Sequence, residues 1–127
     1  MDVRELGPLT LAYLGDALMS VKVREYLIAQ GITKPQELQR HSVRYVSAKA
    51  QASYISQLLE EGWFRSEEEV LYKRGRNAKS LTVPKNTDVV TYKMATGLEA
   101  LWGYLYLANK RERLDELWAK IQEMGEQ

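Results

Sequence analysis

The sequence contains no cysteine and only one histidine, His41. The absence of cysteine excludes a disulfide framework, a thiolate zinc site and a cysteine nucleophile. A single histidine excludes a metal centre built from several imidazoles of one chain, so hard oxygen ligands for Mg²⁺ or Mn²⁺ are what remains. We interpret His41 as a residue near a helix end rather than as a catalytic group.

Long apolar runs are also absent, because no stretch of 18 consecutive apolar residues occurs. The first eight residues carry two acids and one base and lack the features of a signal peptide. We therefore expect a cytoplasmic protein. At 127 residues, the chain has the length of one domain that can bury a core without disulfides.

Strand-like patterns are scarce, whereas helix start and stop signals are frequent. Pro8 and Gly31 bracket a first apolar helix, which we expect to be central and buried on most sides because both of its faces are apolar. Thr87 or Asp88 starts a second apolar helix that ends near Ala108. The sequence therefore predicts a single all-α domain of six or seven helices.

The shorter helices are predicted from their caps. Thr33, Ser47 and Ser66 are the expected N-caps, because a hydroxyl there accepts a hydrogen bond from the first helical turn. Gln36 and Glu69 each follow three residues after a cap, as in a capping box. These helices and the last one are expected over residues 33–41, 47–61, 66–77 and 111–124, with a loop over 80–87.

Each of the two most apolar helices contains one acidic residue, Asp16 or Glu99. An ionised carboxylate in apolar surroundings is unfavourable unless a cation compensates it, and the sequence offers no cation beside either acid. Glycines lie near both acids, at positions 15, 97 and 103. Since glycine is unfavourable inside a helix, these glycines indicate close contact between helices. We predict that the two helices cross with Asp16 and Glu99 facing each other.

Two facing carboxylates repel each other unless they share a proton or a cation. We predict that Asp16 and Glu99 hold Mg²⁺, with water in the remaining octahedral positions. Such a water can attack a phosphodiester while the metal stabilises the developing charge. The alternative is that both acids are partly exposed and form ion pairs with Lys or Arg of another helix.

The net charge is only +1, but the charges are unevenly distributed. Six basic residues and one acidic residue lie between positions 73 and 93, whereas residues 60–69 contain five acids and one base. A basic stretch in a near-neutral protein is typical of a local polyanion site, with a solvated surface loop as the alternative.

These motifs together resemble a known family. Leu14-Gly15-Asp16-Ala17 resembles the core of the ribonuclease III signature, and Leu98-Glu99-Ala100-Leu101 with Gly103 resembles that family's second carboxylate motif. Segments 73–80 and 84–88 are similar to one branch, Mini-ribonuclease III. The wider family has two further acids, at the positions of Ala12 and Thr96, so a metal here is expected to keep more water ligands and to bind more weakly.

The resemblance implies an endoribonuclease that cleaves double-stranded RNA, with Mg²⁺, or Mn²⁺ as a substitute, held by the catalytic residues Asp16 and Glu99. It also implies a homodimer whose two sites cut the two strands. The implied substrate is the precursor of large-subunit ribosomal RNA, with a large-subunit ribosomal protein as a further partner. Residues 1–127 would then be a single ribonuclease III-like catalytic domain, with no residues left for a separate RNA-binding domain.

Without such a domain, the basic stretch is expected to contact the RNA. A-form duplexes are recognised mainly through shape, phosphates and 2′-hydroxyls. The residues that we expect to make these contacts are Lys73, Arg74, Arg76, Asn77, Lys79, Ser80 and Lys85.

Two other functions remain open. A non-catalytic RNA-binding module would explain Ala12 and Thr96 as losses from a decayed site. A helical dimerisation or partner-binding domain would instead use Asp16 and Glu99 in ion pairs. Tyr13 fits either core packing or a dimer interface, where the resembling family places an aromatic residue.

Overall fold

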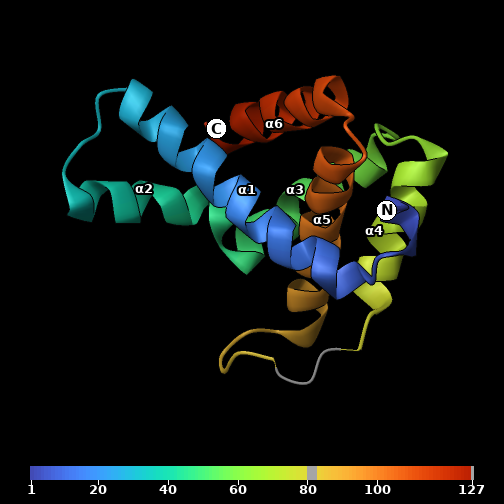
Figure 1. Cartoon of the computed structure of the whole chain (residues 1–127). Coiled ribbons are helices and arrows are strands. Elements are labelled where there is room, and N and C mark those ends of the chain that lie inside the picture. Colours follow the sequence, from blue (N-terminus) through green and yellow to red (C-terminus); the bar gives the residue numbers. More distant parts are fainter. Residues whose placement is uncertain (80–82, 127) are drawn as a thin grey trace.

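Most of the helices of this protein pack against one central helix, α5 (Val89–Leu107) (Figure 1). The computed structural model describes residues 1–79 and 83–126. Within these ranges the elements are a short 3₁₀ helix η1 (Val3–Glu5) and the helices α1 (Pro8–Ala29), α2 (Pro35–Val46), α3 (Ala48–Glu60), α4 (Ser66–Asn77), α5 (Val89–Leu107) and α6 (Arg111–Gly125). The described part of the chain contains no strand, which confirms the predicted all-α fold.

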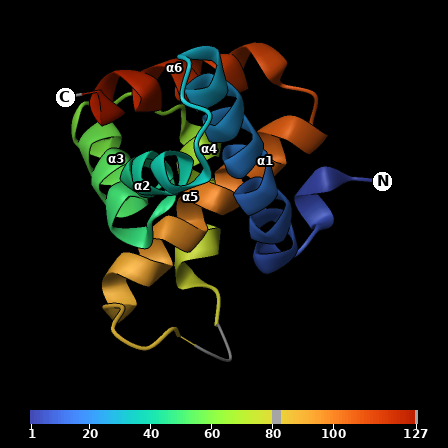
Figure 2. The ribbon, with the colours of Figure 1, turned by 90° about the vertical axis from the view of Figure 1, so that its left-hand side faces the viewer.

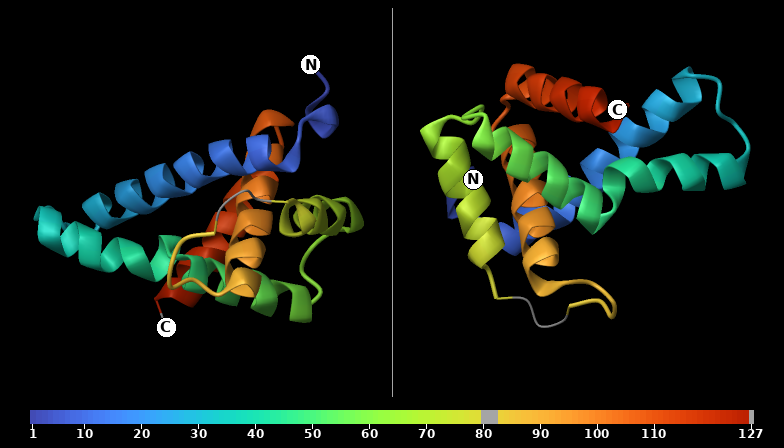
Figure 3. Two further views of the ribbon diagram at one scale, coloured as in Figure 1. Left: turned by 90° about the horizontal axis from the view of Figure 1, so that it is seen from below. Right: turned by 180° about the vertical axis from the view of Figure 1, so that it is seen from behind.

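The central position of α5 follows from its composition. Nearly every residue from Ala95 to Leu105 is buried, and Trp102 at its middle is fully buried. Helices α1, α3, α4 and α6 all contact α5, and the two views in Figure 3 show α1 and α3 on different sides of it. Helix α5 therefore presents its residues, including Glu99, to several neighbours at once.

The prediction that the first helix is buried on most sides was wrong. Helix α1 buries one face, through Leu11, Met19 and Val23, while Tyr13 on the other face is 85% exposed. Both faces of α1 are apolar, so periodicity could not tell which one the core would cover. Asp16 lies on the exposed side, in contact with solvent.

The helix boundaries confirm some caps and correct others. Ser47 accepts a hydrogen bond from the Ala50 amide at 3.1 Å, as predicted, and Asp88 accepts one from the Thr91 amide at 3.1 Å. Helix α2 instead begins after Lys34 without a side-chain cap and continues to Val46, past the predicted end. Helix α4 begins one residue earlier than its predicted capping box, because the N-cap is Arg65, whose amide donates to Glu68.

The described residues that precede α5, 83–87, lie at the end of the molecule where α4 stops and α5 starts (Figure 2). The predicted loop over 80–87 is confirmed for its described part, residues 83–87. No helix in the described ranges combines the length and apolarity needed to cross a membrane.

Candidate active site at the crossing of α1 and α5

Two glycines allow the backbones of α1 and α5 to touch. A Cβ atom on Gly15 would lie 1.7 Å from the carbonyl oxygen of Glu99. A Cβ atom on Gly103 would lie 2.0 Å from the carbonyl oxygen of Leu11. The predicted close crossing is therefore confirmed, and it places Asp16, which follows Gly15, beside the turn of α5 that carries Glu99.

Gly97 faces α4, whereas the prediction placed it at the crossing with α1. A Cβ atom there would lie 2.6 Å from the ring of Tyr72 on α4. Gly75 of α4 faces the same region, because its Cβ atom would lie 2.8 Å from that of Ala100. These two glycines bring α4 close to α5, so that α5 is held tightly on both sides of the turn that carries Glu99.

The two carboxyl groups interact with each other. Glu99 is half-buried, and burial is the largest cause that raises its pKa from 4.5 to about 8. A hydrogen bond with Asp16 and repulsion by the Asp16 charge raise this pKa further. Without a cation the pair therefore holds a proton at neutral pH, as expected for two carboxylates at short range.

Among the described residues, no basic side chain neutralises this pair. Neither Asp16 nor Glu99 takes part in the ion pairs found in that part of the chain. Glu68 shows what a compensated buried acid looks like, because Arg113 donates to its two carboxylate oxygens at 2.7 and 2.8 Å. The alternative in which Asp16 and Glu99 serve in ion pairs is therefore not what the structure shows.

The site contains two carboxylates rather than four. No group of three or more acidic, histidine or cysteine side chains suited to a metal occurs in the ranges that the structure covers. Ala12 and Thr96 are buried at the two positions where the wider family has acids. The Thr96 hydroxyl donates to the Tyr92 carbonyl oxygen at 3.0 Å, within its own helix. Any metal held here would keep most of its water ligands.

One buried polar side chain of the site was missed by the sequence analysis. Gln51 on α3 is 2% exposed, and its side chain lowers the pKa of the Glu99 carboxyl group, against the larger effects that raise it. A signal was available, since Gln51 shares the buried face of α3 with Ile55 and Leu58. A polar residue on such a face requires a partner, and the fold shows that Nε2 of Gln51 donates to the Val46 carbonyl oxygen at the end of α2, at 2.9 Å.

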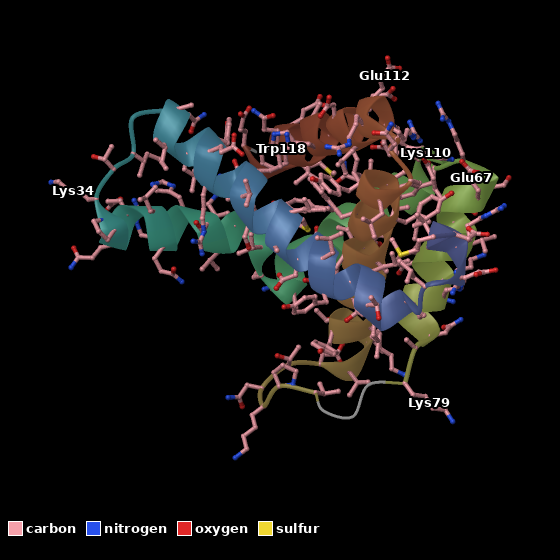
Figure 4. All side chains as sticks on the ribbon, viewed as in Figure 1. Lys34, Glu67, Lys79, Lys110, Glu112 and Trp118 are labelled. Carbon is pink, nitrogen blue, oxygen red and sulfur yellow. The ribbon has the colours of Figure 1, made fainter. Side chains whose placement is uncertain are left out.

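The basic residues divide into free and engaged groups. Lys73, Lys79 and Lys85 are exposed, and Figure 4 shows Lys79 at the end of the molecule where the loop starts. Arg74, in contrast, donates to the carbonyl oxygens of Leu6 at 3.2 Å and Arg4 at 3.3 Å. The guanidinium of Arg74 therefore binds the N-terminal segment rather than standing free for a phosphate.

Two other residues that were predicted to contact RNA have partners within the protein, and a third lies outside the described part of the chain. The Arg76 guanidinium lies 5.7 Å from the centre of the Tyr72 ring and donates to the Asn77 side chain at 3.2 Å. Ser80 lies outside the described residues.

Glu99 is ten residues from Val89 at the loop end of α5, which is about 15 Å along a helix. A polyanion that contacts both the carboxylate pair and the loop end of α5 would have to span about this length.

The helical fold, the glycine crossing and the facing carboxylates define a ribonuclease III type of catalytic domain. Residues 9–110 match the family described as Ribonuclease III domain. The chain therefore belongs to the ribonuclease III family.

Individual relatives narrow this assignment. The chain is 52% identical over 127 residues to Mini-ribonuclease 3 of Enterococcus faecalis, covering 98% of this chain and 96% of that one. It is 49% identical over 119 residues to Mini-ribonuclease 3 of Staphylococcus aureus, covering 94% and 89%. The crystal structure of protein FN1578 from Fusobacterium nucleatum superposes with a TM-score of 0.83 at 32% identity, covering 99% and 98%. The family branch is Mini-ribonuclease III, and the activity is that of an endoribonuclease, an RNA phosphodiester hydrolase.

The raised pKa of Glu99 makes the stability of the metal-free protein depend on pH. The pKa of Glu99 in the folded state, about 8, lies above the ordinary value of 4.5, so the folded protein binds this proton more tightly than the unfolded chain does. The folded state therefore has its full stability below about pH 4.5 and loses the contribution of this proton as the pH rises through 8. We expect Glu99→Gln to remove this loss and to raise the free energy of unfolding at pH 8 by about 1–3 kcal/mol, with little change at pH 4.5.

Urea unfolding in EDTA at both pH values measures this effect. Glu60→Gln, at an exposed position of α3, is the matched control and is expected to match the wild type. Equal pH profiles for the wild type and Glu99→Gln would contradict the shared proton.

Proposed function

We propose that Asp16 and Glu99 are the catalytic pair of this endoribonuclease and that they hold Mg²⁺, with Mn²⁺ as a substitute. The observation that carries the proposal is the carboxylate pair itself, which meets at a glycine crossing without a cation from the described residues. The donor set fits the metal, because Mg²⁺ prefers oxygen ligands and is commonly bound through one or two carboxylates plus water.

Asp16 and Glu99 would have different roles in the site because they differ in exposure. Asp16 is exposed and can face an incoming phosphodiester, while Glu99 is half-buried and fixed by its neighbours. When bound, the metal supplies a lowered pKa for a water ligand and stabilises charge that develops on the phosphate. Asp16 and Glu99 would hold and orient the cation, and they would bind it in their deprotonated form.

We propose double-stranded RNA as the substrate, bound in part by the exposed lysines of the loop. Residues 1–127 would act as one catalytic domain whose own surface contacts the duplex. Exposed lysines suit this task because an A-form duplex presents regularly spaced phosphates and no readable major groove. Lys73, Lys79 and Lys85 are the exposed candidates.

We propose that the protein acts as a homodimer through the exposed face of α1. Tyr13, Val21 and Ile28 on this face are 85%, 53% and 56% exposed. Exposed apolar side chains gathered on one helix favour burial against another chain, and the exposure of Tyr13 makes the core-packing interpretation wrong. A two-fold axis near α1 would set two carboxylate pairs against the two strands. Sedimentation of Tyr13→Ser against the wild type tests this dimer.

The natural substrate that we propose is the precursor of large-subunit ribosomal RNA in the cytoplasm, with a large-subunit ribosomal protein as an assisting partner. This part of the proposal is supported by the resemblance of the motifs to Mini-ribonuclease III. Incubating the purified protein with that precursor, with and without the bound ribosomal protein, tests it.

The decisive test of the general function uses a plain RNA duplex. The protein is incubated with the duplex in Mg²⁺, in Mn²⁺ and in EDTA, and the products are resolved on a denaturing gel. Cleavage only with metal supports the proposal, whereas binding without cleavage under all conditions would favour a non-catalytic RNA-binding module.

The exposed lysines should carry part of the salt dependence of RNA binding. We expect replacement of Lys73, Lys79 and Lys85 by Gln to weaken duplex binding and to reduce the slope of log K against log salt by up to about one for each lysine that binds a phosphate. The reason is that fewer condensed counterions are released on binding. Fluorescence anisotropy at several salt concentrations, in EDTA, gives both quantities.

Lys34→Gln is the control for this prediction, because Lys34 is exposed at the remote turn between α1 and α2 (Figure 4). Its affinity and salt slope are expected to equal those of the wild type. An unchanged slope for the triple variant would move RNA recognition to another surface.

A further inference from the structure

The segment before α1 covers a cation that lies among the residues proposed to bind RNA. Arg74, in the last turn of α4, donates to the Arg4 carbonyl oxygen at 3.3 Å and to the Leu6 carbonyl oxygen at 3.2 Å. Figure 1 shows the N-terminal segment beside α4. We call residues 2–6 the N-terminal strap. It occupies two donors of a guanidinium whose neighbour along α4, Lys73, is exposed.

The strap gives Arg74 weaker partners than RNA would. Arg74 takes part in none of the ion pairs found in the described part of the chain, and neutral carbonyl oxygens leave its charge uncompensated. A phosphate compensates that charge, and its oxygens match the fork of guanidinium donors. A phosphate that reaches Arg74 can therefore compete with the two carbonyl oxygens.

The strap is also weakly held. None of the residues of η1, all of which the structure describes, is buried. Val3 and Leu6 are only half-buried where they pack against the core. The ion pair between Arg4 and Asp2, at 3.5 Å, is exposed and contributes little. A segment with so little buried apolar surface can open locally while the rest of the domain stays folded.

We propose that the N-terminal strap is an autoinhibitory element, which withholds Arg74 from RNA until the duplex displaces it and Arg74 binds a phosphate. This inference rests on the proposed function, because it concerns the same RNA-binding surface. The full chain must open the strap before it gains the contact, and the cost of opening lowers the apparent affinity. Any event that detaches the strap would therefore strengthen RNA binding.

The first test compares the full chain with a variant that lacks residues 2–6, by fluorescence anisotropy with duplex RNA in EDTA. We expect the shortened protein to bind about tenfold more tightly, which is the effect of one hydrogen bond between charged groups. Arg74→Gln should then weaken the shortened protein about tenfold but the full chain less than about threefold. In the shortened protein it should also reduce the slope of log K against log salt by about 0.9.

Two controls separate this effect from general electrostatics. Lys73→Gln removes a neighbouring exposed cation and should weaken both proteins by the same factor. Asp2→Asn combined with Glu5→Gln removes the acidic charges of the strap but keeps the carbonyl oxygens that bind Arg74. We expect this double variant to bind within about threefold of the wild type, because exposed charges are screened by salt.

A second measurement follows the strap in the full chain and does not require the shortened protein to fold. Since the chain contains no cysteine, Glu5→Cys places a single nitroxide label on the strap. Electron paramagnetic resonance is expected to show a more mobile label when duplex RNA is added, close to the mobility of the same label in Arg74→Gln. A label at Lys34→Cys, on the remote turn, should not change.

The outcomes distinguish the inference from the proposed function. The inference is wrong if Arg74→Gln weakens the full chain and the shortened protein equally, or if neither is affected. A shortened protein that binds more weakly would show that the strap itself contacts RNA, which also overturns the inference. A label that stays immobile in the RNA complex would do the same. In each of these cases duplex binding by the wild type still stands, whereas its absence would remove the proposed substrate and the inference together.

Discussion

We expect Asp16→Asn and Glu99→Gln each to reduce cleavage of duplex RNA by more than about 100-fold. Losing even a residue that only orients a metal ligand reduces activity by about 10–100-fold, so losing a ligand charge should cost more. No third acid of the described residues compensates at the site, because Ala12 and Thr96 occupy the other two positions. With one carboxylate left, the cation binds more weakly and lowers the pKa of its water less.

The assay compares single-turnover rates at saturating RNA over a range of Mg²⁺ concentrations. Asp115→Asn and Glu60→Gln are the controls, since both acids are exposed and lie on α6 and α3, outside the crossing. Cleavage by either active-site variant at near the wild-type rate under saturating Mg²⁺ would show that the mechanism is wrong.

Binding of RNA is expected to be separable from cleavage. Duplex affinity is dominated by phosphate contacts from basic side chains, and neither Asp16 nor Glu99 supplies one. Both variants should therefore bind duplex in EDTA about as well as the wild type, because neither substitution removes a phosphate contact. A large drop in affinity would mean instead that the substitution had disturbed the fold.

The facing carboxylates could be predicted from the sequence because the signal is local. Gly15 and Asp16 are adjacent, so a glycine that permits contact necessarily places the acid near that contact. The same reasoning failed for Gly97, because a helical glycine says that something approaches closely but not which helix does so. Its actual neighbour is Tyr72 of α4.

The exposure of α1 and the partners of Arg74 could not be predicted, since both depend on distant parts of the chain. Arg74 binds carbonyl oxygens nearly 70 residues earlier. Local patterns report which faces are apolar or charged, whereas the packing of whole helices decides which of those faces become buried.

Gly15→Ala is expected to have the second-largest effect, because it affects the fold and the site together. The added Cβ atom would lie 1.7 Å from the Glu99 carbonyl oxygen, and this oxygen belongs to a helix backbone that cannot rotate away. Overpacking of this kind destabilises a protein by about 3 kcal/mol, and the better helix propensity of alanine offsets about 1 kcal/mol of this. We therefore expect the free energy of unfolding to fall by about 2 kcal/mol.

The activity of Gly15→Ala should fall further than its stability alone explains. Relieving the contact requires α1 and α5 to separate by roughly 2 Å, and a misplacement of about 1 Å can already reduce a rate 100-fold. Urea unfolding and single-turnover cleavage at a temperature where the variant is folded measure the two effects. Gly7→Ala is the control, since its Cβ atom would meet nothing closer than the Thr10 hydroxyl at 4.0 Å. A folded Gly15→Ala protein with wild-type cleavage would mean that catalysis does not require the two helices at this separation, and the carboxylate pair would lose its structural basis.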